Sequence, residues 1–68
     1  MEHRKLVGLG PGGLGTLDIT LEDTIVKARL TGPGVDNEWQ KTVAPGTTID
    51  DVMPEIFAVL NLANKPPS

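Results

Sequence analysis

The chain has 68 residues, enough for one small domain, and a net charge of −3 with charges of both signs dispersed along it. Six Lys and Arg residues without a basic patch argue against nucleic-acid binding, and no apolar run approaches the roughly 20 residues that span a bilayer. The absence of cysteine excludes disulfides, thiolate metal sites and a thiol nucleophile.

Glycine dominates the beginning of the chain. Residues 4–7 could form a short strand, and residues 8–15 follow with the sequence GLGPGGLG. Because glycine loses the most backbone entropy on ordering, this composition disfavours regular structure. We predict a Gly-rich N-terminal arm or loop over residues 1–16.

Three segments then alternate apolar and polar residues with the period of a half-buried strand. They cover residues 17–22, 24–31 and 38–44, and turn signals separate them at Glu22-Asp23 and at residues 32–37. Trp39 and Val43 share one face of the third segment. We interpret Trp39 as a core residue, with a binding hot spot as the alternative.

One helix is predicted after the strands. N-cap residue types crowd residues 47–51, in front of an apolar segment. Proline is tolerated in the first helical turn but not deeper, so Pro54 places the start near Asp51, after a loose turn that holds Ile49. The helix should end near Ala63, because the following Asn-Lys-Pro-Pro sequence cannot continue it.

The predicted helix is apolar on two sides. Its core stripe follows helical spacing and consists of Val52, Met53, Ile56, Phe57, Leu60 and Ala63. A helix that is apolar nearly all round is normally covered on more than one side. We therefore predict a protein interface on the outer face, formed by Glu55, Ala58, Val59 and Leu62, with Val59 and Leu62 near its centre.

These elements predict an α+β fold in which a small antiparallel sheet of three to four strands carries one C-terminal helix packed on it. The compact domain should span residues 17–63, and residues 64–68 should form a short Pro-rich tail.

Residues 24–62 resemble half of a ubiquitin-like β-grasp domain. The resemblance rests on the strand-turn-strand of residues 24–44 and on the sequence VAPGTTIDDV, residues 43–52, which leads into the helix. It implies a carrier or binding module. That family places further strands after the helix, and its carriers end in Gly-Gly, whereas this chain ends in Lys-Pro-Pro-Ser. Carrier chemistry is therefore disfavoured.

The Gly-rich stretch matches G-x-G-x-x-G twice, at Gly8, Gly10 and Gly13 and at Gly10, Gly12 and Gly15. With the preceding residues it resembles the start of a Rossmann dinucleotide-binding domain. That use of the motif needs a helix whose N-terminus faces the pyrophosphate, whereas residues 17–22 alternate like a strand. Nucleotide binding is therefore the weakest of the three functional hypotheses.

No group of residues predicts catalysis. His3 is the only histidine, and nothing in the sequence supplies it with a positioned partner. The acidic pairs at 22–23 and 50–51 lack the spacing of a calcium loop and suit turn and helix-cap roles. We expect no catalytic residue, no cofactor and no metal site.

The favoured function is a non-enzymatic interaction or structural protein in a larger assembly, such as a virion accessory protein or a small complex subunit. Its partner should be a protein or a second copy of the chain, with no nucleic acid and no membrane. Glycines interrupt any apolar core of a signal peptide. We therefore expect a soluble protein inside a cell or a virion in preference to a secreted one.

Overall fold

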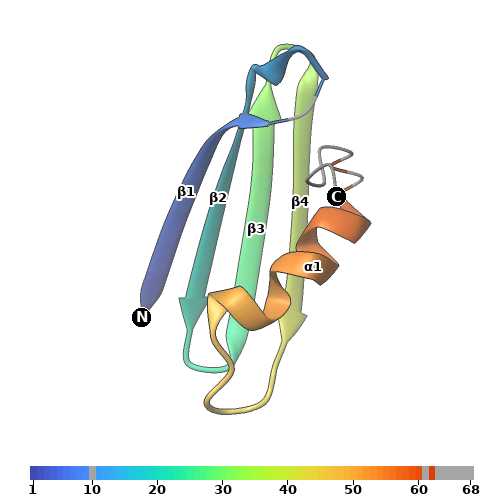
Figure 1. The fold of residues 1–68 in the computed structure, drawn as a ribbon. Helices are drawn as coiled ribbons and strands as arrows, with labels where there is room; N and C mark the ends of the chain where they lie inside the picture. Colours follow the sequence, from blue (N-terminus) through green and yellow to red (C-terminus); the bar gives the residue numbers. More distant parts are fainter. Residues whose placement is uncertain (10, 61, 63–68) are drawn as a thin grey trace, which may run out of the picture.

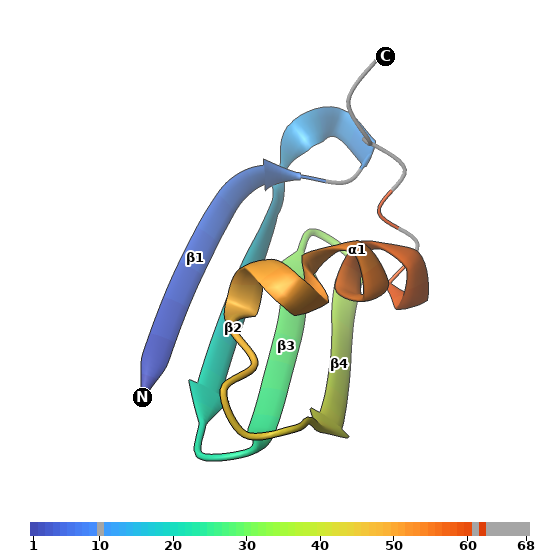
Figure 2. The same cartoon turned by 60° about the horizontal axis from the view of Figure 1, so that its bottom comes forward.

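The computed structural model describes residues 1–9, 11–60 and 62 of the chain. Its elements are β1 (Glu2–Leu9), the 3₁₀ turn η1 (Pro11–Gly13), β2 (Gly15–Glu22), β3 (Ile25–Gly32), β4 (Val35–Thr42) and α1 (Ile49–Val59). The strands form one sheet in the order β1-β2-β3-β4 with every neighbouring pair antiparallel, and α1 lies across one face (Figures 1 and 2). This confirms the predicted α+β fold.

The core lies between α1 and the facing side of the two inner strands. Alternate side chains of a strand point to the same side of the sheet. The buried residues are Leu17, Ile19 and Leu21 in β2, Val26, Ala28 and Leu30 in β3, and Ile49, Val52, Ile56, Leu60 and Leu62 in α1 and the residues after it. Met53 and Phe57 pack partly against this core. The predicted stripe is therefore confirmed, except for Ala63, which lies outside the described residues.

The N-terminal residues form an edge strand where we expected a Gly-rich arm or loop over residues 1–16. Residues 2–7 pair in regular register with β2, and the register shifts between Val7 and Leu9, where Gly8 has a φ of 77°. The glycines are thus confined to the connection between β1 and β2 and the residues beside it. The short strand expected at residues 4–7 is confirmed, and pairing with β2 extends it over residues 2–9.

Strand β4 begins at Val35, earlier than predicted. Only Pro33 and Gly34 form the turn before it, and Gly34 has a φ of 73°, which glycine adopts without steric cost. Val35 then stands opposite Gly32 in the ladder. The polar residues after the turn belong to an exposed edge strand, which explains why their composition resembled a loop.

The predicted start of the helix near Asp51 is wrong, because Thr48 is the N-cap and the helix begins at Ile49. Asp51 N donates to Thr48 Oγ1 (3.3 Å), and Thr48 N donates to Asp51 Oδ2 (3.0 Å). Pro54 therefore lies inside the helix. This capping box and the burial of Ile49 offset the hydrogen bond that Pro54 cannot donate.

The expected exposure of Leu62 on the outer helix face is also wrong. The helix ends at Val59 with Leu60 as the C-cap. The Leu62 backbone N–H then donates to the carbonyl oxygen of Phe57 at 2.9 Å, and Leu62 is only 5% exposed. A helical wheel does not apply beyond the cap, so the chain brings Leu62 to the core.

Candidate functional site

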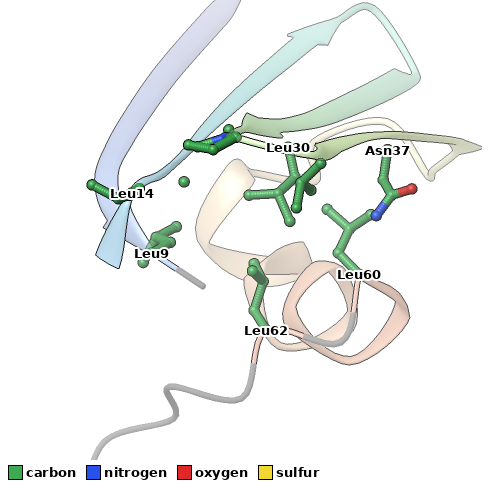
Figure 3. A pocket seen from close by; sticks show the side chains of 10 residues that line it. Leu9, Leu14, Leu30, Asn37, Leu60 and Leu62 are labelled. Atoms are coloured by element: carbon green, nitrogen blue, oxygen red, sulfur yellow. The ribbon is translucent and has the colours of Figure 1, made fainter. Parts of the chain in front are cut away.

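An apolar hollow of about 270 Å³ lies between the sheet and the end of α1 (Figure 3). Its lining residues are Leu9, Leu14, Gly15, Leu30, Gly32, Pro33, Val35, Asn37, Leu60 and Leu62. Figure 3 shows Leu60 and Leu62 pointing towards the sheet from the end of the helix. Asn37 is the one polar side chain among these ten residues, so the hollow suits an apolar group with at most one hydrogen bond from the wall.

Two glycines let the strands approach closely beside this hollow. A Cβ at Gly15 would lie 2.7 Å from the carbonyl oxygen of Leu9 and 3.3 Å from Leu30 Cδ1. A Cβ at Gly32 would lie 3.3 Å from the carbonyl oxygen of Leu14. Sequence reasoning missed this packing role for glycine. The only signal for it was that Gly15 lies two residues before an alternating strand pattern.

The structure places the four residues of the predicted helix interface in different surroundings. Ala58 is exposed and Val59 is 47% exposed, so both lie on the outer surface of α1 as expected. Glu55 is half-buried and accepts a hydrogen bond from Lys41 Nζ at 2.8 Å. Leu62 lines the hollow instead of the outer face. The interface role of these residues stays a prediction.

Trp39 is half-buried on the α1 side of the edge strand β4. It stands opposite the buried Ala28 and packs against the core. This agrees with its interpretation as a core residue. Its position in an edge strand also keeps part of the indole accessible, so the hot-spot alternative stays open.

The sheet face turned away from α1 is mostly polar, with Val7 and Ile25 as its exposed aliphatic residues. Arg29 donates two hydrogen bonds to Asp36, at 3.1 and 3.2 Å, and these bonds raise the pKa of the Arg29 guanidinium. His3 Nε2 lies 3.4 Å from Asp18 Oδ1, a partner that the sequence alone did not reveal. Among residues 1–9, 11–60 and 62, no three His, Cys, Asp or Glu side chains gather as metal ligands.

The segment that follows the Gly-rich motifs is strand β2, as predicted. A Rossmann loop would lead into a helix at this point. Gly10, which both motif matches share, lies outside the described residues. Within the part of the chain that the structure describes, no helix has the length and apolar character needed to cross a membrane.

Comparison with protein-family models, curated proteins and solved structures finds no match for this chain. The resemblance of residues 24–62 to a ubiquitin-like domain stays a prediction.

Proposed function

We propose that this chain is a non-enzymatic interaction or structural component of a larger protein assembly. The observation that carries the proposal is the apolar hollow at the end of α1, whose ten described lining residues offer one amide and no ionisable group. Such a surface suits an apolar side chain of a partner protein, since burying one contributes about 1.5–3 kcal/mol.

The rim of the hollow supports the proposal. Leu14 lines it and is 66% exposed. A single exposed aliphatic side chain is ordinary on a protein surface. Beside a concave apolar surface, however, such residues are typical of sites where a partner's anchor residue docks.

The experiment replaces Leu14 by Lys in a tagged chain isolated from its native source. The matched control is Ile25→Lys, because Ile25 is also an exposed aliphatic residue (39%) but does not line the hollow. Both variants should change the free energy of unfolding by less than about 0.5 kcal/mol. Native mass spectrometry should show a stoichiometric partner with the wild type and Ile25→Lys, and its loss with Leu14→Lys.

Two results would contradict the proposal. The first is a wild-type chain that is isolated without any stoichiometric protein partner or second copy. The second is a Leu14→Lys variant that keeps every partner at wild-type stoichiometry while remaining folded.

A further inference from the structure

Charged side chains on the open face of the sheet form an alternating row. Lys5 stands opposite Asp18, Asp18 opposite Arg29, and Arg29 opposite Glu38. The sign therefore alternates across all four strands, from a cation in edge strand β1 to an anion in edge strand β4. Arg29 forms an ion pair with Asp36, and Asp18 lies 3.4 Å from His3 Nε2, whereas among the described residues Lys5 and Glu38 have no such partner.

On the α1 side, two rows of residues that stand opposite one another across the four strands also end in side chains that attract each other. One row begins with Glu2 in β1 and ends with Lys41 in β4, and the next begins with Arg4 and ends with Trp39. Glu and Lys attract each other, and a guanidinium is attracted to the face of an indole. Within one chain Arg4 pairs with Asp50, Lys41 pairs with Glu55, and Glu2 accepts a hydrogen bond from Ile49 N. These side chains would share or exchange those contacts where a row continues into the first residue of an identical row.

The backbone groups of both edges suit this continuation. Val43 N donates to Thr24 O at 2.7 Å, which marks Thr24 and Val43 as a hydrogen-bonded pair at the end of the β3–β4 ladder. Hydrogen-bonded and non-hydrogen-bonded pairs alternate along antiparallel strands. The register therefore fixes which residues of an edge strand point their backbone N–H and C=O groups away from the sheet. These are Asp36, Glu38 and Gln40 in β4, and His3, Lys5 and Val7 in β1.

We propose that copies of this chain associate head-to-tail, with β1 of the next copy pairing antiparallel with β4. In this register Lys5 of the next copy stands opposite Glu38, Glu2 opposite Lys41, and Arg4 opposite Trp39. The outward backbone groups of both edges then bond each other, and the charges select the register. A slip of two residues in one direction would place Arg4 opposite Lys41. A slip in the other direction would place Glu2 opposite Trp39 and leave no residue of β1 opposite Lys41.

The helices leave room for this contact. α1 has 11 residues and is therefore about 16 Å long, whereas four strands advance the sheet by about 19 Å. α1 crosses the strands and its end projects beyond β4 (Figures 1 and 2), so it would lie over β1 of the next copy, and the next helix would follow on the same face. A head-to-tail contact of this kind repeats, and it generates a ring or a filament.

The irregularity of β1 sets the length of the contact. Regular register ends at Val7, and Gly8 has a left-handed φ. A bulge disrupts the ladder and bends an edge strand. The new pairing therefore joins residues 2–7 of one copy to residues 36–41 of the other. β4 itself pairs with β3 in regular register over all eight of its residues.

The inference rests on the proposed assembly function and names a second copy as the partner. Its test uses Lys5→Glu and Glu38→Lys in the full chain. Each variant alone places like charges opposite each other at the contact, and self-association by sedimentation velocity should weaken at least tenfold. An equimolar mixture restores opposite charges at every contact, because β1 of each variant then meets β4 of the other. The mixture should therefore assemble as the wild type does.

Two charge-matched controls belong to this test. Lys27→Glu and Glu22→Lys make the same charge changes on the open face of the inner strands, and both should assemble normally. Gln40→Pro removes an outward backbone N–H without touching the β3 ladder, and it should abolish association while the variant stays folded.

The proposal is overturned if folded Lys5→Glu and Glu38→Lys associate as tightly as the wild type, or if their mixture stays monomeric. It is also overturned if the wild type is monomeric up to roughly 1 mM. A monomeric wild type that still loses a foreign partner on Leu14→Lys would leave the proposed function standing, so the two failures are distinguishable.

Discussion

The backbone N–H of Leu62 donates to the carbonyl oxygen of Phe57 at 2.9 Å. This bond spans five residues, one more than an α-helical bond, and it turns the chain back after the C-cap at Leu60. As a result Leu62 is 5% exposed and closes one side of the apolar hollow. The end of α1 therefore belongs to the core and to the candidate site at once.

Leu62→Lys should unfold the protein or destabilise it strongly. A buried Leu→Ala change costs about 2–5 kcal/mol, and an unpaired buried ammonium costs more. Val59→Lys is the matched control, because its side chain is 47% exposed, and it should cost less than about 0.5 kcal/mol. Urea unfolding of the two variants decides the point. Equal stability would show that Leu62 is not part of the core.

Thr48→Ala should destabilise the fold by about 1 kcal/mol, because it removes the acceptor for the Asp51 backbone N–H. Thr48→Ser keeps a hydroxyl and should stay close to the wild type. The measurement is the midpoint of thermal unfolding, with amide hydrogen exchange at the start of α1. If Thr48→Ala is as stable as Thr48→Ser, the capping box does not fix the start of the helix.

Gly15→Ala should destabilise the protein by about 1–3 kcal/mol, because its Cβ would lie 2.7 Å from a backbone oxygen of Leu9 that cannot rotate away. The control is Gly12→Ala, which meets no atom within 4 Å but must adopt a φ of 76°, at a cost of about 1–2 kcal/mol. Amide shifts should move at Leu9 in Gly15→Ala and stay unchanged there in Gly12→Ala. Unperturbed Leu9 signals in Gly15→Ala would refute the close approach.

The ion pair between Arg4 and Asp50 ties β1 to the beginning of α1. The hydrogen bond from Arg4, together with its charge, holds the pKa of Asp50 below the usual aspartate range. A depressed folded-state pKa contributes stability above the unfolded value of about 3.9, and this is lost as the pH falls through the folded value. Both groups are exposed, so the contribution is small and screened by salt.

An NMR titration of the Asp50 carboxyl tests this pair. Arg4→Gln should raise the pKa of Asp50 towards the usual range, whereas Lys27→Gln in β3 should leave it unchanged. An identical Asp50 pKa in Arg4→Gln and the wild type would show that the ion pair does not form in solution.

The amino-acid pattern alone is enough to predict the two inner strands, the presence of one C-terminal helix and most of the core stripe. Apolar and polar residues alternate in residues 17–22 and 24–31, because one face of each strand is buried and the other is polar. This pattern can be read from neighbouring residues alone. The burial of Ile56 and Leu60 follows from helical spacing for the same reason. These features need no knowledge of which element packs against which.

Contacts between distant segments fix the two edge strands and the candidate site. β1 is ordered by pairing with β2, and β4 by pairing with β3, so neither needs a strong pattern of its own. The hydrogen bonds at the two ends of α1 are local, but the burial of Ile49 and Leu62 beside them depends on the sheet that they face. The hollow combines residues from all four strands and the end of α1, and no local pattern records contacts between segments so distant in the chain.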